Sequence, residues 1–227
     1  MYFQHDCRPR ARKPEQAGGG WRRLWSGQGL GYDELRLTGG DRPMEEVHVR
    51  QAGAADAAAI SVVHRSAFAG DAEAELVEAL AGSSHYVPEL SLVAEIGGRV
   101  CGHIMLFRVA LQKPDGVSVD VLALAPMAVV PSRTHRGVGS ALIRAALTRA
   151  ASLAYRAVIV VGYPDYYGRF GFSEARDKGV SCPLPVPAES VLACELVTGA
   201  LEGGGQLLYP QEFTRLFRQP RRAAPFL

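Results

Sequence analysis

The sequence contains no long hydrophobic run. Its longest nearly apolar stretch, 121–131, is too short to span a bilayer as a helix, which takes about 20 residues. The first 14 residues carry four basic side chains but no apolar stretch of the kind that a secretory signal requires. Both absences predict a soluble protein with no membrane partner.

Cysteine and metal-binding patterns are also scarce. The four cysteines, which show no C-x-x-C spacing, are Cys7, Cys101, Cys182 and Cys194. The following histidines show no metal-ligand spacing and receive no role: His48, His64, His85 and His103. The sequence therefore predicts neither a bound metal nor a disulfide framework, and the reducing cytoplasm is the expected location.

Charge is balanced overall but unevenly placed along the chain. The net charge is +2, yet residues 1–43 hold eight basic and five acidic residues, and 218–227 add three arginines. The body between them, 44–217, has 14 basic and 18 acidic residues and a net charge of −4. A body of that sign binds nucleic acid poorly and tolerates a cationic amine better than a polyanion. Nucleic acid is therefore not an expected partner.

Regular apolar spacing begins only after the first 43 residues. Glycines interrupt the segment 1–43, including the triplet 18–20, and we expect it to be a mostly disordered extension. The pattern from 44 to 217 is that of one folded domain, and 218–227 form a basic tail. The length and the 48% hydrophobic content suit such a single domain.

Hydrophobic periodicity predicts alternating strands and helices within 44–217. The expected strands cover 47–49, 90–96, 99–111, 117–130, 157–161 and 207–209. The expected helices begin near Asp56 and Glu73 and cover 137–153, 188–197 and 211–217, with a short turn of helix at 164–170. Gly97-Gly98 is a two-residue hairpin signal, and the almost wholly apolar run 117–130 belongs in the middle of the sheet. The fold class is therefore α/β.

A glycine-rich helix start follows that central strand. Gly137-x-Gly139 opens the helix, where free backbone N–H groups and the helix dipole favour an anion such as a pyrophosphate. The basic turn before it contributes Arg133, His135 and Arg136. The dinucleotide fingerprint fails because Leu142 replaces its third glycine, and the P-loop Gly-Lys-Ser/Thr is absent. Taken alone, the two glycines fit a tightly turned helix start equally well.

This stretch resembles motif A of the GCN5-related N-acetyltransferases, the GNAT superfamily. In that motif a strand ending V-x-P precedes Q/R-x-x-G-x-G/A. Val129-Val130-Pro131 matches the first part, and 134–139 matches the second except that Thr134 replaces Gln or Arg. Pro126 resembles the break that family members carry in this strand, where it splays from its neighbour.

A second resemblance follows the next strand. Tyr167-x-x-x-Gly171-Phe172 matches motif B of the same family. Pro164, the doubled tyrosine and the Pro-rich segment after Gly179 resemble the YhbS-like branch, and the resemblance spans about 46–217. Together the two motifs imply a mixed, mostly antiparallel sheet, splayed in the middle and flanked by helices.

The resemblance also implies a cofactor and its binding residues. The cosubstrate would be acetyl-CoA, its pantetheine arm pairing with the splayed strand and its pyrophosphate meeting the glycine loop. The implied cofactor-binding residues are Met127, Ala128, Val129, Thr134, His135, Arg136, Gly137, Val138, Gly139 and Ser140. Tyr167 would be the general acid that protonates the departing thiolate, and Tyr166 would pack beside it.

The general base and the acceptor are not specified by the sequence. Asp120, Glu73, Glu75 and a water molecule are alternatives for the base. The expected reaction is direct attack of a primary amine, from a small molecule or a peptide, on acetyl-CoA in a ternary complex. The alternative is a CoA-binding regulatory module without turnover, and a homodimer is an open possibility.

Overall fold

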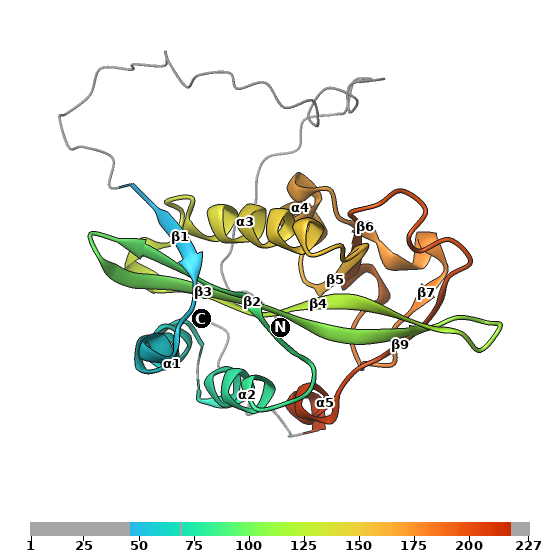
Figure 1. Ribbon diagram of the computed structural model, residues 1–227, viewed down its shortest axis with the longest axis horizontal. Coiled ribbons are helices and arrows are strands. Elements are labelled where there is room, and N and C mark those ends of the chain that lie inside the picture. Colours follow the sequence, from blue (N-terminus) through green and yellow to red (C-terminus); the bar gives the residue numbers. More distant parts are fainter. Residues whose placement is uncertain (1–45, 69, 219–227) are drawn as a thin grey trace, which may run out of the picture. The chain divides into compact units, whose positions relative to one another are not determined.

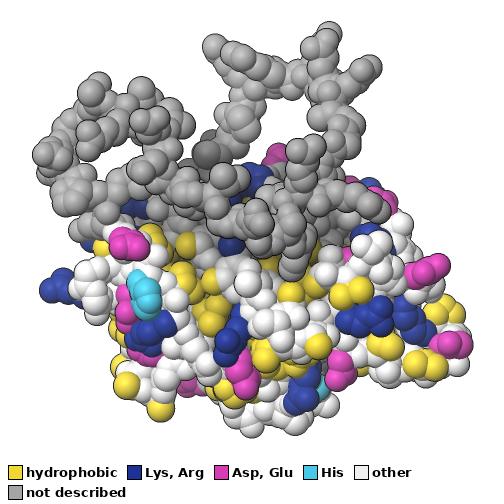
Figure 2. Space-filling view, turned by 45° about the horizontal axis from the view of Figure 1, so that its top comes forward, with side chains coloured by type: hydrophobic (Ala, Val, Ile, Leu, Met, Phe, Trp, Pro, Cys, Tyr) yellow, Lys and Arg dark blue, Asp and Glu magenta, His cyan; other side chains and the backbone are white. Residues whose placement is uncertain are grey.

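The computed structural model of the protein describes residues 46–68 and 70–218. The extension 1–43 and most of the basic tail, both named above, lie outside the described residues. Within the described part, no helix is long and apolar enough to cross a membrane. Basic and acidic side chains are interspersed over the described part of the face shown in Figure 2, as expected of a body with a small net charge.

The described chain forms one mixed sheet of nine strands with helices on both faces (Figure 1). The strands are β1 (His48–Gln51), β2 (Tyr86–Ile96), β3 (Arg99–Gln112), β4 (Ser118–Val129), β5 (Ala157–Val161), β6 (Ser173–Glu174), β7 (Val180–Ser181), β8 (Val191–Glu195) and β9 (Gly205–Leu208). The helices are α1 (Ala57–Ala67), α2 (Ala72–Ala81), α3 (Val138–Ser152), α4 (Pro164–Tyr167) and α5 (Gln211–Arg218).

The strand order is β1-β2-β3-β4-β5-β8-β6, and β9 pairs with both β3 and β7. The pairs β4–β5 and β7–β9 are parallel, and the other pairs in the sheet are antiparallel. This confirms the predicted mixed, mostly antiparallel α/β fold. Helix α3 lies on one face with α4, whereas α1, α2 and α5 lie on the other (Figure 1).

Two apolar clusters fill the spaces between the sheet and its helices. Strand β4 supplies both: Leu122 and Leu124 pack with α3, whereas Val121, Ala123 and Ala125 face α2 and α5. Because both faces of β4 are buried, its sequence is almost continuously apolar. The expected turn at Gly97-Gly98 is present, with φ of +56° and +72°, and joins β2 to β3.

One predicted element was wrong. The helix expected over 188–197 is a short 3-10 turn, Ala188–Ser190, followed by strand β8. Residues 191–194 are all buried, and β8 pairs with β5 on one side and β6 on the other. A short apolar run does not distinguish a buried strand from a helix, and the Pro187-x-Glu189 signal that favoured a helix serves only the 3-10 turn.

Candidate cofactor and catalytic site

The two central parallel strands separate where the sequence predicted a splay. Strands β4 and β5 pair from Leu122↔Val158 to Leu124↔Val160, which is the last pair between them. Beyond that point β4 stays with β3, through a register shift opposite Ile104–Leu106 that accommodates Pro126 as a bulge. The bulge bends β4 away from β5 and opens the sheet at its centre.

The predicted pantetheine-binding residues lie on the separated part of β4. Met127 and Ala128 are 3% and 0% exposed, and Val129 is half-buried. Their backbones pair with β3 at Ile104, His103 and Gly102, so β4 presents its other edge to the splay. Because the Met127 side chain packs in the core beside α3, any contact with a cofactor falls to the backbone.

The predicted phosphate loop connects β4 to α3. Residues 131–133 form a 3-10 turn, which the Thr134 hydroxyl closes by donating to the Pro131 carbonyl at 2.9 Å. His135, Arg136 and Gly137 are exposed, and α3 begins at Val138. Thr134 therefore stabilises the turn, while the exposed backbone around Gly137 is presented to solvent at the N-terminus of a 15-residue helix.

The two loop glycines serve different purposes. Gly137 has a φ of +81° with open space where a Cβ would lie, so its role is the left-handed backbone that precedes the helix. A Cβ on Gly139 would lie 2.8 Å from the phenol oxygen of Tyr166. The absence of a side chain at Gly139 thus makes room for the Tyr166 ring of the turn after β5.

Tyr166 connects the second motif to the phosphate loop. Its pKa is raised because it is partly buried, although Arg169 and a hydrogen bond with Ser140 lower it in part. The Arg169 guanidinium lies 4.7 Å from the centre of the Tyr166 ring, and Phe170 packs edge-on at 5.6 Å. The turn after β5 and the start of α3 are therefore packed together as one unit.

Tyr167 is buried at the base of the same turn. It is 2% exposed and packs edge-to-face against Tyr166 and Phe172. A Cβ on Gly162 would overlap the Tyr167 ring, so glycine is required where β5 ends. Burial raises the pKa of Tyr167 well above its usual value, which keeps the phenol protonated at neutral pH.

The carboxylates considered as bases are not brought to the splay as a group. Asp120 is exposed near the start of β4, five residues and roughly 17 Å of strand before Ala125. Glu73 is buried at the start of α2, and Glu75 is exposed on the same helix. Asp120 is therefore a charge at the far end of the strand.

Sequence reasoning missed a buried histidine pair on the face opposite α3. His64 of α1 and His103 of β3 are both fully buried, with Nε2 of His64 2.8 Å from Nδ1 of His103. Nε2 of His103 lies 3.0 Å from Ser91 Oγ, and Nδ1 of His64 is buried without a hydrogen-bond partner. Burial lowers the pKa of His64 to about 4 and that of His103 well below its usual value, so both are neutral at pH 7.

The only sequence signal for this pair was the position of each histidine. His64 falls on the same helix face as Ile60 and Val63, and His103 lies in an apolar strand. Spacing along the chain cannot reveal a contact between residues 39 positions apart. Within the described residues, no cluster of three or more histidine, cysteine, aspartate or glutamate side chains could hold a metal ion.

Comparisons with known proteins agree on one family. A sequence model described as an acetyltransferase (GNAT) domain matches residues 48–175. The chain is 39% identical over 135 residues to the uncharacterized N-acetyltransferase YjhQ of Escherichia coli, covering 59% of this chain and 74% of YjhQ. It is 31% identical over 162 residues to the uncharacterized N-acetyltransferase YhbS of the same species, covering 70% of this chain and 94% of YhbS.

Solved structures give the same result. The crystal structure of Escherichia coli YhbS in complex with CoA has a TM-score of 0.71 and 28% identity, covering 78% of this chain and 97% of YhbS. A GNAT family acetyltransferase from Brucella melitensis in complex with acetyl-CoA has a TM-score of 0.61 and 28% identity, covering 74% and 99% of the two chains.

Proposed function

The chain belongs to the GNAT acetyltransferase family, and from that premise we propose that it transfers an acetyl group from acetyl-CoA to a primary amine. The observation that carries this proposal is the separation of β4 from β5 directly before the glycine loop. The two relatives crystallised with CoA and acetyl-CoA support the choice of cosubstrate. A location in the cytoplasm, where thiols stay reduced, is part of the proposal.

The cofactor would lie along β4 and end at the glycine loop. The amides that open α3, from Gly137 to Ser140, would bind the pyrophosphate, with the exposed Arg136 adding positive charge. The pantetheine arm would pair with the backbone of Met127–Val129 as an added strand. This arrangement would bring the thioester to the point where β4 and β5 part.

Tyr167 would be the proton donor in the transfer step. The amine lone pair forms a bond to the thioester carbonyl carbon, the C–S bond breaks, and the departing thiolate takes the phenol proton. The amine loses a proton to a water molecule or a base, and N–H groups of the splayed β4 would stabilise the oxyanion. Burial keeps the Tyr167 phenol protonated at neutral pH, so its proton is present when the thiolate forms.

A second candidate function is CoA binding without turnover. The observation that favours it is the position of Asp120, the nearest carboxylate on β4, at the far end of that strand. A radiolabelled acetyl-transfer assay over a panel of primary amines, paired with calorimetry of CoA binding, separates the two functions. Acetyl transfer supports the enzyme, whereas micromolar CoA binding with no transfer to any amine supports the module.

A further inference from the structure

Positive charge is concentrated in the segment that contains the glycine loop and α3. Residues 131–170 hold six arginines and a single acidic residue, Asp165, and so carry a net charge of +5. The rest of the body, 44–130 and 171–217, holds eight basic and 17 acidic residues and has a net charge of −9. A cationic segment in an otherwise acidic body attracts an anion to one place rather than to the whole surface.

Two of these arginines lie against one pair of aromatic rings. Tyr166 and Phe170, four residues apart in the segment after β5, meet edge-on with ring centres 5.6 Å apart. The guanidinium carbon of Arg169 lies 4.7 Å from the centre of the Tyr166 ring and 5.6 Å from that of Phe170. The guanidinium carbon of Arg144, on α3, lies 5.4 Å from the centre of the Phe170 ring. The Phe170 ring therefore contacts both guanidinium groups.

The same rings connect the two arginines to the glycine loop. The Tyr166 phenol is hydrogen-bonded to Ser140, and its oxygen occupies the space beside Gly139. Burial raises the pKa of this phenol, and the positive charges of Arg169 and Arg144 lower it in part, so both charges act on it. Arg144 follows Ser140 by four residues, about 6 Å along the helix, and lies on the same helix face. Because helix side chains lean toward the N-terminus, Arg144 leans toward the amides that open α3.

The guanidinium groups of Arg144 and Arg169 are accessible to a ligand. Both residues are exposed, and among the described residues neither forms an ion pair with a carboxylate. Arg50, by contrast, is bound by the carboxylates of Asp56 and Glu95. An arginine that stacks on an aromatic ring uses the face of its guanidinium, whereas its N–H groups lie in the guanidinium plane and can bind a phosphate bidentately.

The chemistry of CoA requires two anion sites close together. Its ribose carries a diphosphate on the 5′ carbon and a phosphate on the 3′ carbon. The amides of 137–140 would bind the diphosphate, as proposed above, but they cannot also bind a second phosphate. The 3′-phosphate carries about two negative charges at pH 7, and its place on the same ribose keeps it near the first site.

We propose that Arg144 and Arg169 bind the 3′-phosphate of the cofactor, and that this arginine pair makes the protein select CoA over a cofactor that lacks the phosphate. This inference rests on the cofactor role proposed above. Tyr166 and Phe170 hold the two guanidinium groups in position, and the adjoining glycine loop supplies the site for the diphosphate.

The test compares two ligands and three variants of the full chain. Calorimetry measures the binding of CoA and of 3′-dephospho-CoA to the natural chain, Arg144→Ala, Arg169→Ala and the control Arg149→Ala. Arg149 is exposed on the same helix and contacts neither ring, so its variant removes the same charge elsewhere on α3. All measurements use one ionic strength because salt screens exposed charges. Thermal denaturation records the stability of each variant.

The natural chain should bind CoA at least about tenfold more tightly than 3′-dephospho-CoA. Arg144→Ala and Arg169→Ala should each lower CoA affinity about tenfold, as expected for the loss of a hydrogen bond between charged groups. Each should change 3′-dephospho-CoA affinity by less than about twofold, and Arg149→Ala should change neither affinity by more. Equal affinity of the natural chain for both ligands would overturn the inference. Equal losses for both ligands would do so as well, because they would show that the arginines only support the packing of the turn.

The binding data also keep this inference apart from the proposed acetyl transfer. A loss confined to CoA, in a protein that acetylates no amine, would support the arginine pair and refute the transfer. Acetyl transfer by a protein whose CoA affinity is unchanged in both arginine variants would refute the pair alone. A natural chain that binds neither ligand would refute both proposals.

Discussion

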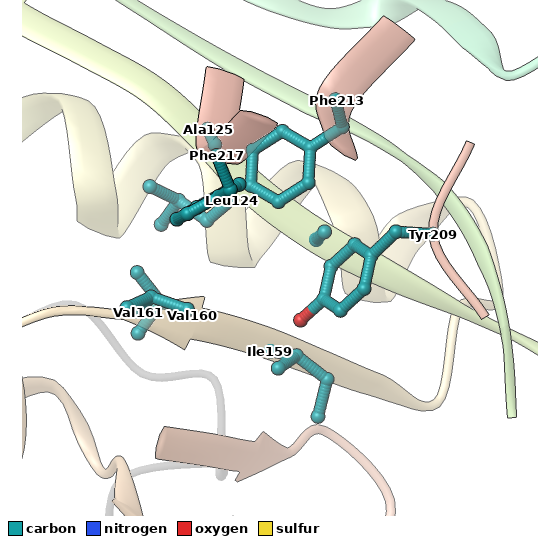
Figure 3. A pocket seen from close by; sticks show the side chains of 9 residues that line it. Leu124, Ala125, Ile159, Val160, Val161, Tyr209, Phe213 and Phe217 are labelled. Atoms are coloured by element: carbon teal, nitrogen blue, oxygen red, sulfur yellow. The ribbon is translucent and has the colours of Figure 1, made fainter. Parts of the chain in front are cut away.

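The two faces of the splayed strands are built in different ways. On the α3 face, the glycine loop and the tyrosine turn lie within 40 residues of each other along the chain, and Tyr166 joins them through Gly139 and Ser140. On the opposite face, a small apolar cavity is lined by residues of β4, β5 and α5 (Figure 3), and roughly ninety residues separate Ala125 from Phe217 in its lining. Short motifs therefore specify the proposed cofactor side, whereas the apolar cavity arises only from the tertiary fold.

The largest expected effect concerns the proposed transfer step. Tyr167→Phe keeps the ring that packs on Gly162 but removes the proton, so kcat should fall by roughly 10²–10⁴ if chemistry limits turnover. Acetyl-CoA affinity and folding should change little. Steady-state kinetics with Tyr166→Phe as the matched control should show a loss under tenfold. Full turnover in both variants would remove a tyrosine acid from the mechanism.

The next effect concerns cofactor affinity. Gly139→Asp places a Cβ 2.8 Å from the Tyr166 oxygen and a negative charge beside the proposed pyrophosphate. Two like charges about 4 Å apart near a protein surface repel by about 4 kcal/mol, so CoA affinity should fall about a thousandfold. Calorimetry is the measurement, and Gly82→Asp, at the end of α2 where a Cβ makes only ordinary contacts, is the control for charge. Unchanged affinity in a folded Gly139→Asp protein would refute the loop assignment.

A smaller effect is expected on the stability of the protein, from the buried pair His64 and His103 on the face opposite α3. The pKa of His64 falls from an ordinary 6.5 to about 4 on folding. The stability that depends on the neutral imidazole is therefore complete above pH 6.5 and is lost as the pH falls toward 4. A shift of that size corresponds to about 3 kcal/mol of unfolding free energy. Two neighbouring groups act electrostatically on the pKa of His103: the His64 imidazole lowers it and the Asp56 carboxylate raises it.

Chemical denaturation at several pH values measures this loss. The natural chain should lose stability from pH 6.5 to 4, and His64→Gln should lose less over the same interval. The control His48→Asn, at a histidine whose side chain is 70% exposed, should follow the natural chain. A natural chain with constant unfolding free energy over this range would contradict the assignment of a neutral buried pair.

The smallest expected effect tests whether either face needs the N-terminal extension. The glycine-interrupted sequence of 1–43 predicts no contribution to packing, so a chain that begins at Met44 should keep its Tm and its CoA affinity. Thermal denaturation and calorimetry check both quantities. A loss of more than about 5 °C in Tm, corresponding to about 1 kcal/mol or more, would show that the extension packs on the domain.

The contrast between the two faces also explains what the sequence could predict. The glycine-rich start of α3, the bulge at Pro126 and the hairpin at Gly97-Gly98 each depend on residues with special backbone properties, which are visible one at a time. The residues of β8 carry no such signal, because Val191–Cys194 would suit a buried helix as well as a strand. This segment is a strand because it pairs with β5 on one side and β6 on the other.

Side-chain contacts between distant elements were beyond the reach of the sequence. His64 and His103 each have an apolar surrounding that predicts burial, but their hydrogen bond exists only because α1 packs across β3. The clearance that Gly139 leaves for Tyr166 was not predicted, because it depends on a turn 27 residues later. Tyr209, Phe213 and Phe217 have helical spacing, yet nothing in 209–217 indicates that their rings lie where β4 and β5 part.

The long sequence separation between the residues that line the apolar cavity has a consequence for the order of folding. Contacts close along the chain form with a small loop-closure entropy, whereas contacts of high sequence separation form late. The glycine loop and the tyrosine turn should therefore be structured in the folding transition state before α5 docks. In refolding experiments, substitutions at Tyr166 should change the folding rate, whereas those at Phe217 should change mainly the unfolding rate.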